Sequence, residues 1–402
     1  MRAGPSQEEI RRHNLGTLLR HVHLGGPASR AVLADRMGLN RSTIMALTAD
    51  LTAAGLVREE LPKDTGRAGR PSLVVRPEST RVYVLAFDIG VDRLVAARVG
   101  LGGRILDRRE AERSRHHFDM DEVTGVLAGF ARQMVKKASL GTICVGVGVA
   151  FCGMVRQTDG VVRYGPNIGW VDESLGETLA RRLGLGLPVA VGNDANLGAL
   201  AEHERGTGIG CEDLIYLHGD VGIGGGLVVG GRLLTGDGGY GGEIGHMVVN
   251  PDGTPCACGS RGCLEAEVGE KALLAAAGRD EDPTVNGRDA VRAIVDAADR
   301  GDIAARDALH RVGDWLGLGV ANLVNIFNPG LVVFGGTLRE IYLGSAAQVR
   351  SRVTTNVLSV ARENVRMRTP ELGDDTTLVG AAELAFAEVL ASPLEVLARS
   401  TT

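Results

Sequence analysis

The sequence predicts an α/β protein in which a small helical head precedes a larger body of alternating strands and helices. With 402 residues and 44% hydrophobic side chains, the chain is long enough for two or three structural units. Apolar residues repeat at helical spacing in the first 78 residues, whereas buried strands alternate with helices after them. Glycine turns follow several of these strands, as in α/β proteins whose ligands bind at the carboxyl ends of strands. We therefore predict two domains, 1–78 and 79–402.

The head is predicted to contain three helices and a helix-turn-helix. Residues 8–23 carry a stripe of apolar side chains, and two further helices are expected to begin after Ser29 and Asn40. Serine and asparagine are favoured at helix N-caps, and Gly38 stands where a glycine commonly ends a helix. Two short helices joined by a tight glycine-containing turn form a helix-turn-helix.

A wing is predicted to follow the third helix. Segments 56–61 and 72–77 are predicted to be strands around a polar loop rich in glycine and proline. Arginine and hydroxyl side chains suit contacts with base edges and phosphates. The candidate DNA contacts are Arg41, Ser42 and Thr43 in the first turn of the third helix, and Arg67 and Arg70 in the loop. A protein-interaction or dimerisation module is the alternative, although a packing role does not require arginines on such a loop.

The charge distribution favours the same division. The first 80 residues carry 12 Lys and Arg against 8 Asp and Glu, whereas the remainder carries 32 against 41. A basic head on an acidic body is typical of a DNA-binding module joined to a metabolite-binding domain. No apolar run reaches the roughly 18 residues of a membrane span, and no signal-peptide pattern opens the chain. We expect a cytoplasmic protein without a membrane partner.

The body, 79–402, is predicted from strands and helices that alternate. The expected strands are 83–90, a hairpin at 91–110, 142–153, one from 188 that ends in Asn193-Asp194, two strands around a glycine turn in 213–234, and 330–336. The expected helices are 173–184, one that follows Asp194, 270–300, 304–325 and 379–396. Three further cysteines, Cys144, Cys152 and Cys211, are interpreted as small core residues. Because ligands of α/β proteins bind at the carboxyl ends of strands, we expect the ligand site among the polar residues and glycines that end these strands.

Six motifs in a fixed order give the body a family resemblance. They are GPNIGW at 165–170, GNDAN at 192–196, GIGGG at 222–226, GEIGH at 242–246, CACGSRGCLE at 256–265 and VVFGG at 332–336. Together with the head, this set resembles the ROK family (repressor, open reading frame, kinase), specifically its transcriptional-regulator branch. The resemblance covers nearly the whole chain. It implies the two-lobed actin-like, ribonuclease H-like fold of sugar kinases for the body.

A structural zinc site is predicted in the loop 246–263. Its expected ligands are His246, Cys256, Cys258 and Cys263. Three thiolates and one imidazole suit tetrahedral zinc, and four protein ligands leave no position for a substrate. Gly259 and Gly262 would permit the tight turn that this spacing requires. Three ordinary buried cysteines with a hydrogen-bonded histidine are the alternative.

The resemblance also implies a sugar site. Carboxylates, amides and imidazole suit hydrogen bonding to sugar hydroxyls. The family pattern places Asn167, Asn193, Asp194, Glu243, His246 and Glu265 there, and in the family's kinases the position of Asp194 is the general base. A plain helix N-cap is the alternative for the Asn-Asp pair. The family usually has proline-glycine where this chain has Cys152 and Gly153, which changes one wall of the site.

Loss of kinase activity is expected because the first phosphate-binding turn departs from the family pattern. The turn 88–93 reads DIGVDR where family kinases read roughly DIGGTK, so Asp92 would place negative charge where polyphosphate binds. Val221 replaces a kinase threonine in the second turn. The remaining candidate nucleotide-binding residues are Gly222, Gly224, Gly225, Gly335 and Gly336.

We therefore expect a sugar-responsive transcriptional regulator, a repressor, that binds operator DNA as a homodimer or homotetramer. Its effector would be a sugar or sugar phosphate, with glucose, xylose and N-acetylglucosamine all compatible with the polar set. An ATP-dependent sugar kinase with Asp194 as general base is the main alternative, and a DNA-binding protein without effector is another. The sequence leaves the sugar, the operator and the direction of regulation open.

Overall fold

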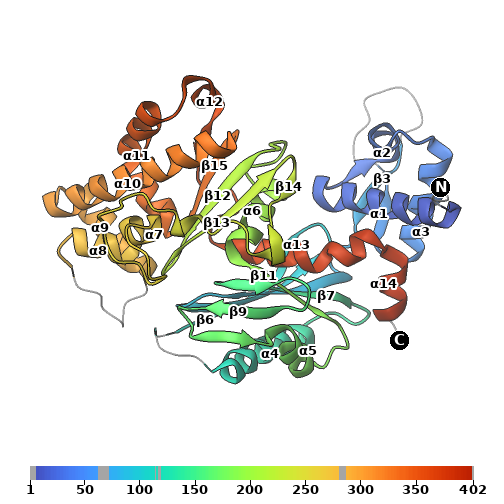
Figure 1. Ribbon diagram of the computed structural model, residues 1–402. Coiled ribbons are helices and arrows are strands. Elements are labelled where there is room, and N and C mark those ends of the chain that lie inside the picture. Colours follow the sequence, from blue (N-terminus) through green and yellow to red (C-terminus); the bar gives the residue numbers. More distant parts are fainter. Residues whose placement is uncertain (1–5, 62–71, 114, 116–118, 280–286, 401–402) are drawn as a thin grey trace.

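The computed structural model describes residues 6–61, 72–113, 115, 119–279 and 287–400, and shows a small head on a body of two sheets (Figure 1). The first sheet has the strand order β11-β7-β4-β5-β6 and the second has β14-β13-β12-β15-β16. If the five strands of each sheet are numbered 1 to 5 in chain order, both sheets have the spatial order 3-2-1-4-5. Strands 1 to 3 form an antiparallel meander, and strands 4 and 5 are parallel to strand 1. This duplication confirms the predicted two-lobed fold.

The head is built as the sequence predicted. Its elements are α1 (Gln7–Gly25), β1 (Ala28–Ser29), α2 (Arg30–Met37), α3 (Arg41–Ala53), β2 (Val57–Glu60) and β3 (Val74–Pro77). The Ser29 side chain accepts a hydrogen bond from the backbone N–H of Val32, and Asn40 caps α3 through the N–H of Thr43 at 2.8 Å. The two predicted wing strands pair antiparallel, and the short β1, which was not predicted, adds a third strand beside β3.

The first lobe carries its sheet between helices from distant parts of the chain. Its strands are β4 (Val82–Ile89), β5 (Arg93–Gly100), β6 (Arg104–Glu112), β7 (Ile143–Phe151) and β11 (Val189–Asn193), and its helices are α4 (Met120–Lys136), α5 (Leu175–Leu183), α13 (Thr376–Ala391) and α14 (Pro393–Ser400). A small sheet of β8 (Met154–Arg156), β9 (Val161–Gly165) and β10 (Trp170–Glu173) extends it. Ile89, Phe151 and Asn193 are aligned across neighbouring strands, so three strand ends meet at one edge.

The second lobe surrounds the other sheet. Its strands are β12 (Leu214–Gly219), β13 (Ile223–Val229), β14 (Arg232–Leu233), β15 (Leu331–Gly336) and β16 (Arg366–Arg368). Its helices are α6 (Asp194–Arg205), α7 (Leu264–Val268), α8 (Glu270–Ala276), α9 (Gly287–Asp299), α10 (Ile303–Phe327), α11 (Thr337–Asn356) and α12 (Ser359–Asn364). Three short 3₁₀ turns complete the description: η1 (Asp237–Gly239), η2 (Ile244–His246) and η3 (Gly373–Asp375).

Helices α6 and α13 lie between the two sheets. Helix α13 packs on β4 and β7 of the first lobe, while α6 packs on β12 and β13 of the second lobe and against α13 (Figure 1). The pair therefore forms the layer across which the lobes meet.

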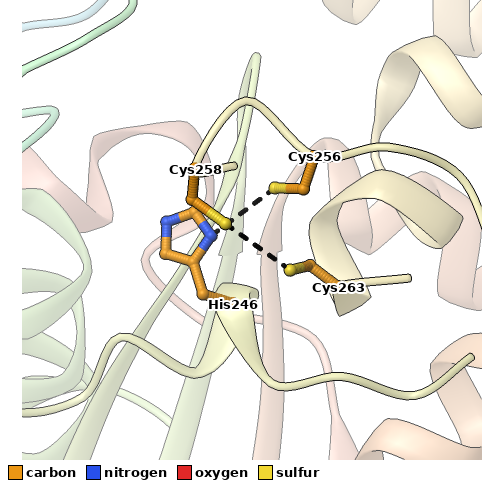
Figure 2. A group of neighbouring side chains, drawn as sticks. All are labelled: His246, Cys256, Cys258 and Cys263. Carbon is orange, nitrogen blue, oxygen red and sulfur yellow. Dashed lines mark hydrogen bonds between the residues drawn. The ribbon is translucent and has the colours of Figure 1, made fainter. Parts of the chain in front are cut away.

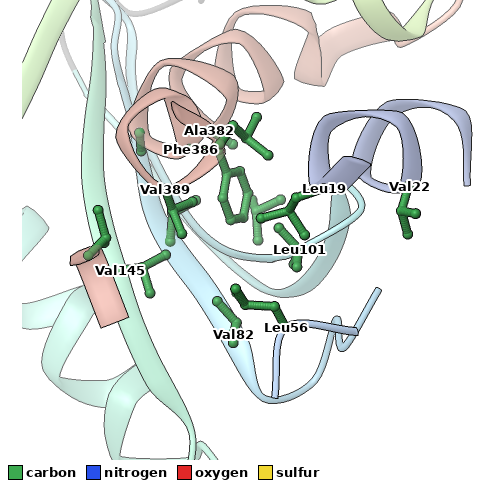
Figure 3. Close-up of a cluster of buried hydrophobic side chains, with 14 of the residues drawn as sticks. Leu19, Val22, Leu56, Val82, Leu101, Val145, Ala382, Phe386 and Val389 are labelled. Atoms are coloured by element: carbon green, nitrogen blue, oxygen red, sulfur yellow. The ribbon is translucent and has the colours of Figure 1, made fainter. Parts of the chain in front are cut away.

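The head shares a hydrophobic core with the body. Leu19 and Val22 of α1 belong to the same buried cluster as Val82, Leu101 and Phe386 of the first lobe (Figure 3). Burying one such side chain contributes roughly 1.5–3 kcal/mol. The predicted boundary after residue 78 therefore separates two units of the chain but does not mark a free linker.

Several helices differ from the prediction. The stretch 270–300 holds two helices, α8 and α9, and the stretch 379–396 spans α13 and α14, which are bent by 102° to one another. Helices α4, α7, α11 and α12 were not predicted. Within the described ranges no single helix is long and apolar enough to cross a membrane; the bent pair meets that test only jointly, by length and composition.

Candidate functional site

A cavity of about 320 Å³ lies between the two lobes, beside the ends of β7, β11 and β12. The structure brings all six predicted sugar-site residues to its wall. They are Asn167 from the β9–β10 loop, Asn193 and Asp194 from the β11–α6 junction, Glu243 and His246 around η2, and Glu265 from α7. Cys152, interpreted from the sequence as a core residue, also lines this cavity, next to Gly153.

The Asn193–Asp194 pair begins helix α6 and also lines the cavity. The Asn193 side chain accepts a hydrogen bond from the N–H of Asn196 at 3.0 Å and donates one to the carbonyl of Gly153 at 3.1 Å. The helix-cap alternative is therefore correct for Asn193, whose amide also ties α6 to the first lobe. Asp194 is 9% exposed and accepts a hydrogen bond from the N–H of Ala195. Burial, followed by the nearby carboxylate of Asp88, raises the pKa of Asp194 well above its usual range.

Glu265 is held by the turn before β13. Its carboxylate accepts a hydrogen bond from the N–H of Ile223 at 3.0 Å. A Cβ at Gly222 would collide with that carboxylate, so only glycine allows this approach. Glu265 is thereby fixed at the boundary between the cavity and the metal loop described below.

The glycines predicted to bind nucleotide have packing contacts of their own. Gly224 and Gly225 lie within strand β13, not in a turn, and a Cβ on Gly225 would collide with Ile244 of η2. Gly335 and Gly336 end β15, where Cβ atoms would collide with the Tyr216 side chain and the β12 backbone. Only Gly222 and Gly224 of this set line the cavity between the lobes. Close packing thus accounts for glycines that the resemblance assigns to phosphate binding.

One histidine and three cysteines converge beside the cavity (Figure 2). The potential ligand atoms of His246, Cys256, Cys258 and Cys263 all lie within 4.8 Å of one another. The His246 Nδ1 is 3.7 Å from the Cys256 sulfur, and the sulfurs of Cys258 and Cys263 are also 3.7 Å apart. This group could hold a metal ion, as the spacing of the sequence predicted.

The loop that carries the cysteines is a tight turn. The Cys256 N–H donates to the carbonyl of Ser260, and the Gly259 N–H donates back to the carbonyl of Cys256. Gly259 and Gly262 have φ of +89° and +66°, values that other residues rarely adopt. The predicted role of these two glycines is confirmed. Because Nδ1 of His246 faces the sulfurs while the residue lines the cavity, one imidazole joins the two sites.

A second, smaller cavity of about 210 Å³ occupies the region predicted to have lost phosphate binding. Asp88, Asp92, Asp194 and Asp220 line it together with further acidic and arginine side chains. Burial, with the neighbouring Asp92 charge, raises the pKa of Asp220 to about 6. A concentration of carboxylates at this position is unfavourable for a polyphosphate.

Asp92 does not act as the expected free negative charge. Both of its oxygens accept hydrogen bonds from Arg115, at 2.6 and 2.8 Å, and one also accepts from the N–H of Gly287 at 3.0 Å. The same guanidinium pairs with Glu270 at 2.7 Å. Asp92 and Arg115 belong to the first lobe and Glu270 and Gly287 to the second, so this group bridges the lobes. The expectation of simple charge repulsion by Asp92 is therefore corrected.

Of the predicted DNA-contacting residues, the structure describes the three at the start of α3 but not the two in the wing loop. Arg41 and Ser42 are exposed at the start of α3, but the hydroxyls of Ser42 and Thr43 both donate to the Asn40 cap. Met45, one turn further along α3, is 52% exposed although its side chain is apolar, and it was not among the predicted contacts. The loop residues Arg67 and Arg70 lie outside the described residues.

A buried polar group, which was not predicted from the sequence, joins the head to the body. His23 of α1 is 1% exposed, and its Nε2 is 2.9 Å from a carboxylate oxygen of Glu383 on α13. The Gly102 N–H donates to Nδ1 of His23 at 2.8 Å, so the neutral imidazole carries its proton on Nε2 and donates to Glu383. Arg205, at the end of α6, pairs with the same carboxylate. Burial lowers the pKa of His23.

Comparison with known proteins agrees with the motifs. The profile of the ROK family matches residues 84–388. A xylose repressor of Bacillus subtilis is 29% identical over 380 residues, which cover 94% of this chain and 96% of that repressor. A solved ROK family transcriptional regulator, a homologue of the E. coli MLC protein, has a TM-score of 0.79 at 25% identity and covers 97% of this chain and 100% of its own.

A kinase relative matches a smaller part. The structure of a Streptomyces griseus ROK glucokinase in complex with glucose and AMPPNP has a TM-score of 0.64 at 29% identity, and covers 75% of this chain and 99% of its own. The regulators therefore match almost the whole chain, head included, whereas the kinase matches three quarters of it. Since the family profile spans well over half of the sequence, this protein belongs to the ROK family.

Proposed function

We propose that this protein is a sugar-responsive transcriptional repressor that binds operator DNA through its head and a sugar in the cavity between the lobes. The observation that carries the proposal is the shared core through which a helix-turn-helix head is packed on α13 of a sugar-kinase-like body. Relatives of nearly full length are xylose repressors and a transcriptional regulator. With DNA as its partner the protein would act in the cytoplasm, as a homodimer or homotetramer reading repeated half-sites.

The cavity offers the chemistry that a sugar requires. Asp194, Glu243 and Glu265 present carboxylates, and Asn167 and His246 present an amide and an imidazole. Such groups accept and donate the paired hydrogen bonds of neighbouring sugar hydroxyls. Because Asn167 belongs to the first lobe and the other four to the second, a bound sugar would favour a closed arrangement of the lobes. The sugar can shift the head between two positions only by as much free energy as the difference in its affinity for the open and the closed lobes.

Helix α6 is the physical connection between sugar and head. It begins at Asp194 in the cavity and ends at Arg205 in the buried head–body group, about 18 Å away for 12 residues. Closing the lobes moves α6 relative to α13, and therefore moves Arg205 relative to Glu383 and His23. We infer that this movement changes the docking of the head, and with it the affinity for DNA.

The Cys/His group is proposed to hold a structural zinc. Zinc–sulfur bonds of about 2.3 Å in a tetrahedron separate sulfur atoms by about 3.8 Å, and the observed 3.7 Å between Cys258 and Cys263 fits that value. When bound, zinc would supply a fixed cross-link and no Lewis-acid chemistry, because four protein ligands close its shell. His246 would be oriented by the metal through Nδ1, leaving its other nitrogen for the cavity.

Fluorescence anisotropy with DNA selected by the protein from a random-sequence pool tests the proposal. Glucose, xylose, N-acetylglucosamine and their phosphates are then added in turn. We expect one of these sugars to weaken DNA binding about tenfold or more, and Glu243→Gln to abolish the response while DNA affinity without sugar is retained. DNA binding that no sugar changes would contradict the repressor proposal.

A sugar kinase is the second candidate, because Asp194 is buried in the cavity with a raised pKa, as a general base would be. The acidic second cavity and the Arg115 bridge argue against a bound triphosphate. ADP release measured with ATP, magnesium and the same sugars decides between them. Turnover that Asp194→Asn abolishes would establish the kinase, and no turnover with any sugar leaves Asp194 as a ligand-binding residue.

A further inference from the structure

A third cavity, of about 860 Å³, adjoins the proposed sugar site. It lies between the metal-binding loop on one side and helices α8 and α10 on the other. Ligand pockets typically measure about 300–1,000 Å³. The cavity between the lobes is at the lower end of that range and suits a single small ring, whereas this one is near the upper end.

The two cavities adjoin and share part of their walls. Asn167, Val221 and Glu265 line both of them, and the metal loop contributes Cys258 to the first and Cys256 to the second. Glu265 stands at the border, since its hydrogen bond from the N–H of Ile223 fixes it there. A ligand held by Glu265 in the first cavity therefore lies directly beside the second.

The walls of the larger cavity differ in polarity, as the faces of a sugar ring do. Val312 and the half-buried Trp315 of α10 give it an apolar side, continued by the alanines of α8. The opposite side is polar, with Asn250, Asp252 and Thr254 on the metal loop. An indole face packs against the C–H groups of a pyranose ring, while amides and carboxylates bind its hydroxyls.

The charges of this cavity favour a neutral ligand. Three cationic side chains, Arg261, Lys271 and Arg311, are matched by three acidic ones, Asp252, Glu265 and Glu267. Arg261 already donates to the carbonyl of Gly253, and Glu267 accepts from the N–H of Thr254. A site for a phosphate group would require an excess of positive charge, which this set does not provide.

We propose that the effector is a neutral disaccharide or longer glycoside, whose first ring occupies the cavity between the lobes and whose second ring lies against Trp315. The proposal rests on the proposed function, since it extends the same sugar site. It makes Trp315 a specificity-determining residue for the size of the effector.

Isothermal titration calorimetry with matched sugars tests the proposal. The pairs are glucose with cellobiose, xylose with xylobiose, and N-acetylglucosamine with chitobiose. We expect one disaccharide to bind the zinc-loaded protein at least about tenfold more tightly than its own monosaccharide. Trp315→Ala should remove that advantage and leave the monosaccharide affinity within about twofold.

A second variant guards against a folding defect at Trp315, which also packs on the core of the second lobe. Ala275 is an exposed residue of α8 that lines the cavity, so Ala275→Phe narrows the cavity without disturbing the core. It too should weaken only the disaccharide.

Two results would overturn the proposal. In the first, every disaccharide binds more weakly than its monosaccharide while the monosaccharide still releases DNA, which leaves the repressor function intact. In the second, no sugar of either size binds, which removes the repressor proposal as well.

Discussion

Replacing Glu383 by glutamine removes the charge that holds His23 and Arg205 together between head and body. The three side chains come from α13, α1 and α6, and Glu383 is 4% exposed. Glutamine has nearly the same shape, so packing is retained and the change acts on the charge alone. After it, the Arg205 guanidinium has no carboxylate partner and retains neutral acceptors, among them the carbonyls of His23 and Gly102, each at 3.2 Å.

The expected cost follows from the burial of Arg205, whose side chain is 10% exposed. Removing one partner of a buried ion pair lowers stability by about 3–5 kcal/mol. Because Arg205 retains two carbonyl acceptors, we expect a cost at the lower end of this range, about 3 kcal/mol. This cost corresponds to an increase of roughly 100-fold in the equilibrium constant for opening of the head. Helix α1 should open while the lobes stay folded.

Native-state hydrogen exchange of the α1 amides measures this opening directly. Glu395→Gln is the matched control, because the Arg12–Glu395 pair also links head and body but is about half exposed on both sides. Exposed pairs contribute about 0–1 kcal/mol, so the control should leave exchange almost unchanged. Equal, small effects of the two variants would refute the reasoning that burial makes the Glu383 group decisive.

Three further predictions concern the body. Cys258→Ser, or zinc removal by a chelator, should loosen η2 and reduce sugar affinity about tenfold, measured by calorimetry; an unchanged affinity would rule out the proposed role of the metal. Asp220→Asn should raise stability at pH 7.5 by up to about 3 kcal/mol, because a carboxyl whose pKa is raised to about 6 destabilises the fold as pH rises from about 4 through 6. The gain in melting temperature should therefore vanish near pH 4, and a gain independent of pH would contradict this account. Arg115→Met should weaken sugar binding by separating the lobes, whereas Arg109→Met, which breaks a pair within the first lobe, should not; equal sugar affinities of the two variants would argue against the bridge.

Local signals predicted the helices of the head and most long strands of the body, whereas the two-lobed fold was predicted from the family resemblance. Ser29 and Asn40 cap the helices that they were predicted to cap, because an N-cap is decided by residues three positions apart. Helix α11 was missed for the opposite reason. Its apolar residues pack against α10 and the second sheet on more than one side, so that no single stripe marks it.

The candidate site was predictable where residue type and spacing decide it. The Cys/His group depends on a few residues in one loop, whereas the six sugar-site residues come from separate loops, turns and one helix and were predicted from the family resemblance. The head–body group was not predictable, because His23, Arg205 and Glu383 are separated by 182 and 178 positions. A lone histidine in an apolar helix stripe has no local feature that identifies partners so far along the chain.

Asp92 has a partner that its place in the sequence did not reveal. The sequence showed a carboxylate in a phosphate-binding turn and predicted repulsion. The structure supplies a cation, Arg115, 23 positions away, which neutralises that carboxylate and ties it to Glu270 in the second lobe. The aspartate of this turn therefore bridges the lobes and bears on the angle between them. Since that angle is the quantity a bound sugar would change, the residue that departs from the kinase pattern belongs to the regulatory machinery that we propose.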